Sequence, residues 1–382
     1  MKFPEKLRQH LEERKKVQTY RRLSLDDPKK IDLYSNDYLG FSRIDFYNNN
    51  IGSAGATGSR LLSGNHAIHV ETERQIAKFH EAEAALLFNS GYVANLGILS
   101  CLPQKGDLIL YDELCHASIK EGLRLSLAKF VKFRHNDTKQ LTDKLREFSS
   151  DRTAIYVITE AIFSMDGDQP DLSAMIEVCE MYGAYLIIDE AHALGVIGNQ
   201  GEGLSQSLHV HSRILARVYT FGKALGAHGA VVVGDQLLID YLINFSRSFI
   251  YTTAMAPAAI QTIAANYHQL ANATILYRDA RAKLDENIEC FRSCITSFNL
   301  QDYFIPNTSA IQCCLLPDTI PVRQAAYFLQ QNNFTVKAIV SPTVPKGKER
   351  LRFCLHAYTT KDEIKSVLTL LSQFIAERKQ NK

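Results

Sequence analysis

The chain of 382 residues is long for a single hydrophobic core and suits one large domain with a smaller one. Its 46% hydrophobic and 22% charged residues are typical of ordinary soluble proteins, and a net charge of +2 gives no sign of a nucleic-acid partner. No apolar run approaches the roughly 20 residues needed to span a bilayer, and the N-terminus lacks the apolar core of a signal peptide. We therefore expect a cytoplasmic protein with neither membrane nor nucleic-acid partners.

The eight cysteines are scattered along the chain and form no CxxC pair. Cys290 and Cys294 lie one helical turn apart in an amphipathic stretch, and Cys313 and Cys314 are adjacent. We expect all eight to be free, mostly buried thiols in a reducing compartment, and we predict no metal site.

The N-terminal residues predict an arm, assigned to 1–45, rather than a domain. Residues 3–20 have a charged helical pattern, and SNDYLGFS (35–42) ends in a glycine turn. The glycine-rich stretch GSAGATGSRLLSGNH (52–66) does not follow a clear strand. We therefore reject a dinucleotide-binding or P-loop interpretation of it.

The next elements are a helix over 69–81, a strand and turn over 84–91, and a helix over 92–102. Ser90, Gly91 and Tyr92 therefore open a helix, whose free backbone N–H groups and dipole suit a phosphate. A simple helix cap is the alternative. DLILYDELCHAS, at 107–118, predicts a strand followed by another helix start.

The segment 155–234 is the centre of the sequence. Its apolar runs, separated by longer helical patterns, predict central strands of a mostly parallel sheet, at 154–159, 185–189, 217–220 and 230–234. Reactive groups in such α/β sheets lie just beyond the carboxyl ends of the strands. Six functional side chains fall there: Glu160, Ser164, Asp189, His192, Thr220 and Lys223.

Asp189 and Lys223 together indicate one cofactor. Asp189 follows Leu186, Ile187 and Ile188, so its carboxylate would enter a poorly solvated pocket that favours a cationic partner. Lys223 lies at a strand-to-helix turn, where a lowered pKa would let it form a Schiff base. Pyridoxal 5'-phosphate needs such a lysine and an acid on its ring nitrogen. Alternatively, Asp189 caps a helix and Lys223 is a surface lysine.

From residue 258 a long helical pattern runs towards 297, and we place the domain boundary within it, near 270. The large domain is then 46–270. The following strand, helix, strand, strand and helix patterns predict a small α+β domain over 271–382. Arg350 and Arg352 share one face of a strand, and an arginine is the expected holder of a substrate carboxylate.

Four motifs, IIDEAHALGVIG, TEAIFSMDGD, TFGKALGAHG and IYTTAMAP, resemble the motif set of the α-oxoamine synthases. The resemblance extends from SNDYLGFS to PTVPKGKERLRFCLHAYTT and so covers nearly the whole chain. It implies a pyridoxal-phosphate enzyme of fold type I, the aspartate-aminotransferase fold. Such an enzyme condenses an amino acid with an acyl thioester and releases carbon dioxide.

The resemblance assigns roles towards the cofactor. It implies that the Ser90–Gly91–Tyr92 turn binds the phosphate and that His116 stacks over the ring, although a lone histidine at a helix start is often structural. Ser164 and His192 are placed to hydrogen-bond the phenolic oxygen, and Thr220 to reach the phosphate. Thr252 and Thr253, otherwise ordinary strand residues, would reach the phosphate of a neighbouring subunit, which implies a homodimer with shared active sites.

Further matches concern the substrates: Arg21, Asn36, Thr343 and Arg352. Arg21 also fits a solvated basic helix end, and Asn36 a local turn. Arg350 is expected at the surface. Val340 departs from an arginine found in some pimeloyl-using members, and FRHND (133–137) receives no chemical role.

The expected catalytic residues are Lys223 as general base, Asp189 on the ring nitrogen and His116 on the new keto oxygen. Within the family, SMDGD, HND and PTVP favour members that join L-alanine to a pimeloyl group carried by coenzyme A or acyl carrier protein. Members that acetylate glycine are the nearest alternative. A catalytically silent partner subunit or binding module is remote, because Lys223 and Asp189 are both present.

Overall fold

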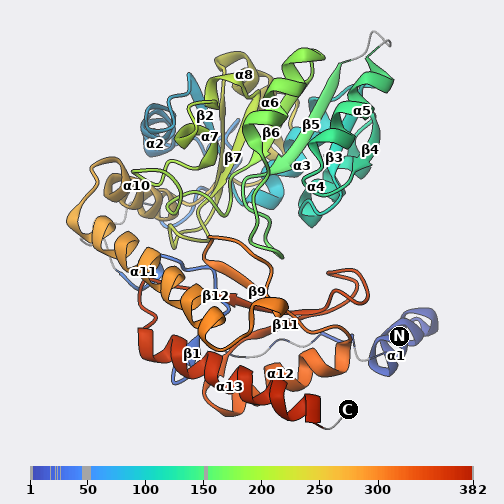
Figure 1. Cartoon of the computed structure of the whole chain (residues 1–382). Coiled ribbons are helices and arrows are strands. Elements are labelled where there is room, and N and C mark those ends of the chain that lie inside the picture. Colours follow the sequence, from blue (N-terminus) through green and yellow to red (C-terminus); the bar gives the residue numbers. More distant parts are fainter. Residues whose placement is uncertain are drawn as a thin grey trace.

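A seven-stranded sheet lies at the centre of the larger part of the molecule, with strand order β2-β8-β7-β6-β5-β3-β4 (Figure 1). The computed structural model describes residues 3–17, 19–21, 23, 25, 27–44, 53–149 and 154–380. The five strands from β7 to β4 are parallel, and β8 is antiparallel to both its neighbours. The strands are β2 (Ala84–Phe88), β3 (Leu108–Asp112), β4 (Lys129–Phe133), β5 (Ile155–Glu160), β6 (Tyr185–Asp189), β7 (Ala216–Thr220) and β8 (Ala230–Gly234).

The predicted α/β fold with a mostly parallel sheet is confirmed. The expected bounds of β6 and β8 agree with the structure, and those of β5 and β7 differ by one residue. These strands are buried on both faces because alternate residues enter two hydrophobic clusters: Leu186 and Ile188 lie in one and Ile187 in the other.

Helices cover both faces of this sheet. The inner residues of α3, α4 and α8 pack on one face, and those of α2, α5, α6 and α10 on the other. The helices are α2 (Ala67–Phe79), α3 (Gly91–Cys101), α4 (Ala117–Leu125), α5 (Thr138–Phe148), α6 (Leu172–Met181), α7 (Leu204–Ser207), α8 (Gln236–Phe245), α9 (Arg247–Ile250) and α10 (Pro257–Ala271).

The smaller part is an antiparallel sheet of order β11-β12-β9 backed by three helices. Its core is continuous with the cluster on one face of the large sheet. Its elements are α11 (Ile275–Ser297), β9 (Ile311–Leu315), α12 (Thr319–Gln331), β10 (Phe334–Thr335), β11 (Lys337–Ile339), β12 (Arg350–Cys354) and α13 (Lys361–Gln380).

Two predicted elements divide in the structure. The helical pattern from 258 to 297 is two helices, because Ala273 has a φ of +42° and Thr274 caps α11 through the backbone N–H of Tyr277. The expected strand over 334–340 is two short strands, since β10 pairs with β1 (Ile31–Asp32) and β11 pairs with β12. The domain boundary near 270 lies beside the first of these breaks and stays a prediction.

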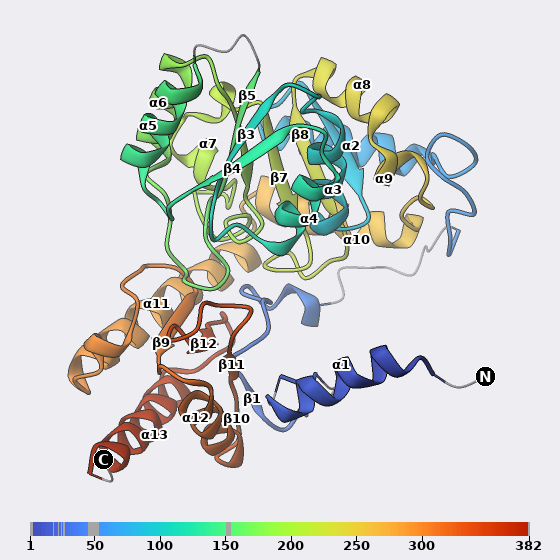
Figure 2. The same cartoon turned by 90° about the vertical axis from the view of Figure 1, so that its right-hand side faces the viewer.

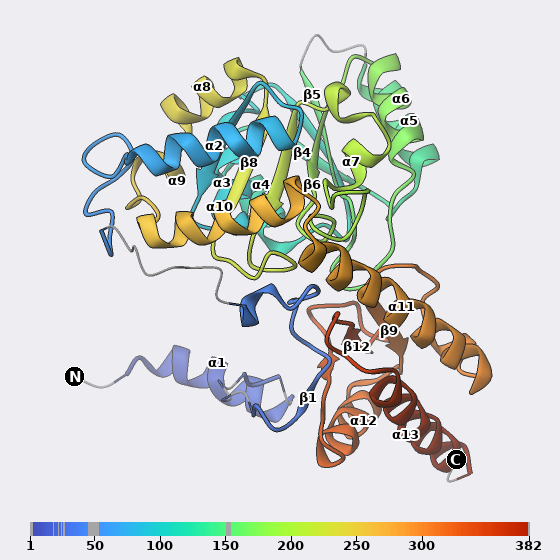
Figure 3. The same cartoon turned by 90° about the vertical axis from the view of Figure 1, so that its left-hand side faces the viewer.

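The helix of the N-terminal arm lies apart from the core, whereas Tyr38 and Phe41, later in the arm, are buried in the core. Helix α1 (Glu5–Lys16) has no buried residue and extends away from the body beside the smaller part (Figure 2 and Figure 3). Arg22, Gly52 and most of the connection between Phe41 and Gly52 lie outside the described residues. No helix in the described ranges is long and apolar enough to cross a membrane.

Candidate active site

A cavity of about 240 Å³ opens where β5, β6 and β7 end. It gathers most of the predicted site residues from five separate stretches of the chain. Those that line it are Asn36, Ser90, Gly91, Tyr92, His116, Asp189, His192, Thr220 and Lys223. The rule that functional groups follow the carboxyl ends of parallel strands therefore holds here.

Asp189 ends β6 and is 7% exposed. Its Oδ1 accepts a hydrogen bond from the backbone N–H of Ala191 (2.9 Å), and its Oδ2 accepts one from Asn95 Nδ2 (2.8 Å). Two donated hydrogen bonds favour the ionised carboxylate. Asp189 thus brings a buried negative charge to the cavity.

Lys223 lies in the turn after β7 and is partly buried. Burial lowers the pKa of Lys223 to about 8, against the opposing effects of Asp189 and Glu160. A lysine with such a pKa is partly neutral near pH 7 and can act as a nucleophile or base.

Glu160 is the third ionisable group at these strand ends. It is 3% exposed, and its Oε1 accepts the backbone N–H of His116. Burial, and then the neighbouring Asp189, raise the pKa of Glu160 to about 8. Asp189, whose two oxygens accept hydrogen bonds from Ala191 and Asn95, is the carboxylate suited to a cationic partner.

The start of α3 forms the opposite wall. The Ser90 side chain caps the helix by accepting the N–H of Val93 (3.3 Å). A Cβ atom at Gly91 would lie 2.2 Å from Thr220 Cγ2, so only glycine lets the helix start approach β7 this closely. The arrangement leaves a helix N-terminus facing the cavity, which suits a phosphate.

A hydrogen-bonded chain joins the cavity to the N-terminal segment. His192 Nδ1 lies 2.7 Å from the Tyr38 hydroxyl, which donates to Asn36 Oδ1 (3.2 Å). Burial holds the pKa of His192 well below its ordinary value, so this ring is neutral. Asn36 Oδ1 also accepts from Arg352 (2.9 Å).

Arg352 is buried at the edge of the site. It donates to the backbone oxygen of Ser164 (2.6 Å) and to Cys354 Sγ (2.9 Å). Arg352 is only 7% exposed. Its guanidinium nevertheless forms no salt bridge with any residue that the structure describes. A buried guanidinium without a carboxylate suits the carboxylate of a substrate.

Six predicted residues, Arg352 among them, do not line this cavity. Thr252 and Thr253 lie beside Asn89, whose Nδ2 donates to Thr252 Oγ1 (3.2 Å) and to the Thr253 carbonyl (3.0 Å). The backbone of Ser164 contacts Arg352. Arg21, which is exposed, and Thr343 line a second cavity of about 540 Å³, with Val340, between the arm and the smaller part.

The placement of Arg350 at the surface is wrong. Arg350 is 4% exposed, pairs with Asp166 Oδ1 and donates to the Met165 carbonyl (3.0 Å). β12 is the central strand of its sheet, between β11 and β9. Both of its arginines are buried against the loop that follows β5. That loop, 161–168, is therefore held by the smaller part.

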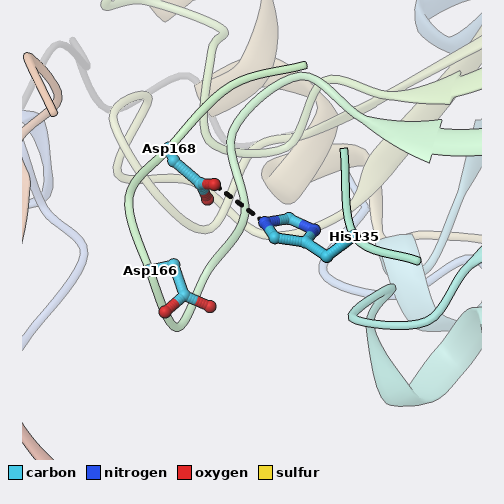
Figure 4. A group of neighbouring side chains, drawn as sticks. All are labelled: His135, Asp166 and Asp168. Carbon is cyan, nitrogen blue, oxygen red and sulfur yellow. Dashed lines mark hydrogen bonds and ion pairs between the residues drawn. The ribbon is translucent and has the colours of Figure 1, made fainter. Parts of the chain in front are cut away.

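The FRHND motif, for which no chemical role is expected, holds the other side of the loop. His135 Nε2 lies 2.8 Å from Asp168 Oδ2 (Figure 4). On the other side of the ring, His135 Nδ1 lies 3.0 Å from Asp112 Oδ1. Burial lowers the pKa of His135, but hydrogen bonds to Asp112 and Asp168 outweigh it and raise this pKa to about 10.

His135, Asp166 and Asp168 also have the composition of a metal site. However, a metal ligand must be a neutral histidine, whereas this one is held protonated with both nitrogens on carboxylates. Asp166 is already paired with Arg350. The group therefore functions as an ion-pair network.

Three residues that were not among the predicted site residues contact them: Asn95, Ser118 and Tyr38. Glu160 was expected at the strand ends, and the structure adds its contact with the His116 backbone. Asn95 could have been found, because it lies one helical turn after Gly91 and so faces the same side of α3. Ser118 and Tyr38 become visible only once the fold brings distant segments together.

Comparisons with known proteins agree with this architecture. The family description "Aminotransferase class I and II" matches residues 28–371. An 8-amino-7-oxononanoate synthase of Emericella nidulans is 38% identical over 98% of this chain and 97% of its own length. One from Thermoanaerobacter pseudethanolicus is 33% identical over 95% of this chain and 94% of its own.

Solved structures give the same picture. Serine palmitoyltransferase from S. paucimobilis, with a bound PLP–myriocin aldimine, has a TM-score of 0.88 at 26% identity and covers 99% of both chains. 8-Amino-7-oxononanoate synthase from Francisella tularensis has a TM-score of 0.77 at 30% identity, covering 92% of this chain and 99% of that one.

Replacing Arg350 tests the hold on the 161–168 loop. Arg350→Met leaves the Asp166 carboxylate buried and unpaired, so we expect a loss of about 3–5 kcal/mol of unfolding free energy. Urea denaturation measures it. The matched control is Arg292→Met, which breaks an exposed pair with Glu289 and should cost below about 1 kcal/mol. Equal losses would contradict the buried ion pair.

The raised pKa of His135 makes stability depend on pH. The folded value of about 10 exceeds the ordinary ~6.5, so the stabilisation is complete below pH ~6.5 and is lost as pH rises through 10. The difference in unfolding free energy between the wild type and His135→Gln should therefore shrink from pH 6.5 to 10. His10→Gln, in the exposed arm helix, should give a flat difference.

Proposed function

Because the chain belongs to the class I and II aminotransferases and, within them, to the α-oxoamine synthases, we propose that it makes 8-amino-7-oxononanoate. It would do so by condensing L-alanine with a pimeloyl thioester, with release of carbon dioxide, as a step of biotin synthesis. The observation that carries the chemistry is the pairing, in one cavity, of Lys223 at a pKa of about 8 with the buried carboxylate of Asp189.

The residues present fit pyridoxal 5'-phosphate. Asp189 supplies a buried negative charge for a protonated ring nitrogen, and Lys223 a nucleophilic amine. The start of α3, which Gly91 alone permits against Thr220, supplies N–H groups for the phosphate. When bound, this cofactor supplies an electron sink for the electrons left at the substrate α-carbon.

The chain's own groups would perform the proton and binding steps. Arg352 would bind the carboxylate of the amino acid, exchanging its neutral partners for a charged one. Lys223 would remove the proton from the α-carbon, since its lowered pKa lets it act as a base near neutral pH. His116 would donate a hydrogen bond to the oxygen that gains charge. His192 and Ser164 would contact the phenolic oxygen, and Thr220 the phosphate.

The second cavity supports a pimeloyl substrate over an acetyl one. Among the described residues, its lining contains four basic side chains and no acidic ones: Arg14, Arg21, Arg323 and Lys337. A pimeloyl group ends in a carboxylate, which such a cavity would attract, whereas an acetyl group has none. Arg323 and Lys337 would supply the charge missing at Val340. Thr343 lies in the same wall.

We propose a cytoplasmic homodimer in which Thr252 and Thr253 reach the phosphate of the neighbouring subunit. Exposed large apolar residues near α2, α8 and α9 support an interface that a partner would cover. They are Leu62 before α2 (82% exposed), Leu237 on α8 (80%) and Tyr251 after α9 (74%).

Release of the carrier thiol tests the function. We expect turnover with L-alanine plus pimeloyl-coenzyme A or pimeloyl-acyl carrier protein, and none with glycine plus acetyl-coenzyme A. Lys223→Ala should reduce the rate by at least ~10³-fold without a change in circular dichroism. Lys139→Ala, an exposed lysine on α5, is the control. Turnover with the glycine pair alone would move the protein to glycine C-acetylation, and an active Lys223→Ala would refute the catalytic scheme.

Arg21→Ala tests the basic cavity. Loss of one charge-assisted hydrogen bond to the far carboxylate should raise the KM for pimeloyl-coenzyme A about tenfold or more. The KM for L-alanine should not change. Arg8→Ala removes a charge from the same arm outside the cavity and should leave both constants unchanged. Equal KM values for Arg21→Ala and the wild type would place the acyl carboxylate elsewhere.

A further inference from the structure

One hydrogen-bonded chain connects Asp189 to His116 through two side chains with no assigned role. Asn95 Nδ2 donates to Asp189 Oδ2 (2.8 Å) and to Ser118 Oγ (3.0 Å). Ser118 Oγ in turn lies 2.8 Å from His116 Nδ1. Asn95 is 4% exposed and Ser118 is fully buried, so both are part of a preformed structure.

Close packing of two helices creates this chain. Asn95 lies on α3 and Ser118 at the start of α4. A Cβ atom at Gly122, one turn after Ser118, would lie 2.9 Å from Leu99 Cβ and 3.1 Å from the Asn95 carbonyl oxygen. Glycine at this position therefore lets α4 approach α3 until the Ser118 hydroxyl reaches the Asn95 amide.

The donors in this chain fix the tautomer of His116. The backbone N–H of Ser118 points at His116 Nδ1 (3.2 Å), so Nδ1 accepts a hydrogen bond and carries no proton. Ser118 Oγ already accepts a hydrogen from Asn95, which leaves its own hydrogen to donate to the same Nδ1. The proton of the neutral ring is therefore on Nε2.

We infer that Asn95 and Ser118 are positioning residues that hold His116 as a neutral Nε2–H donor and Asp189 as a carboxylate. The two hydrogens of one amide accomplish both: one favours the ionised form of Asp189, and the other orients the Ser118 hydroxyl towards His116. The inference rests on the proposed function only in the role given to His116, which is to donate a hydrogen bond to an oxygen that gains charge.

The charged groups around His116 act in different directions. Burial lowers its pKa, Asp189 opposes that effect, and Lys223 and Lys120 add to it. Glu160 binds the backbone of His116, and the neutral His192 also lies close enough to interact with the ring. Loss of the Ser118 hydroxyl would leave this charged environment unchanged, so a changed His116 titration would report on the hydrogen bond.

Nitrogen-15 NMR of the histidine rings tests the tautomer directly. It uses the full-length chain with and without cofactor, and assigns His116 by the signals lost in His116→Gln. We expect the Nε2–H form, with a midpoint below the ordinary ~6.5. In Ser118→Ala the ratio of protonated to neutral His116 ring at pH 6 should rise roughly tenfold, the equivalent of one hydrogen bond. A Nδ1–H ring, or a titration unchanged by Ser118→Ala, would overturn the inference.

Activity provides the second readout. In Ser118→Ala the acid limb of the kcat/KM profile should move to higher pH, and Ser118→Thr, which keeps the hydroxyl, should restore it. Ser207→Ala removes a serine hydroxyl bonded to a helix carbonyl away from the site and should leave the profile unchanged. A merely structural role for Ser118 would lower the rate equally at every pH. The NMR result stands even if the chain turns over none of the proposed substrates, so the two proposals fail separately.

Discussion

The buried carboxylate of Asp189 is the constraint on which the rest of the site depends. A negative charge at the end of an apolar strand is costly unless donors and a cation meet it. Asn95 and the Ala191 backbone supply donors, and Lys223 lies across the same cavity. The low solvation that makes the buried charge of Asp189 energetically unfavourable also lowers the pKa of Lys223. This lowered pKa makes the lysine reactive. One environment thus produces both functional groups.

The position of the smaller part is built into the same site. Arg350 and Arg352 project from β12 and bind the loop after β5 through the Met165 and Ser164 carbonyls. The His135 network holds the other end of that loop on the large sheet. A substrate carboxylate would draw Arg352 away from the Ser164 carbonyl, and the loop would then lose one of the contacts that hold it. Substrate binding and the position of the loop are therefore coupled.

Much of the fold could be predicted from sequence because its strands are apolar on both faces, and a pattern of that kind has few alternatives. Asp189, Lys223 and Thr220 followed from the strand ends alone. The burial of Arg350 could not be predicted in this way. Alternation along β12 shows that two arginines share a face, but not what covers that face. Ser118 and Tyr38 depend on contacts with Asn95 and His192, which lie far away in sequence.

The two cavities divide the work that the proposed reaction requires. The cavity at the strand ends contains a carboxylate and an amine of tuned pKa, so any change there alters the chemistry. The basic cavity is formed partly by an arm whose helix buries no residue. Substitutions in α1 cost little stability, because no packing is lost. Under the proposed function, the residues that recognise the acyl group can therefore change there while Asp189, Asn95 and Lys223 stay fixed.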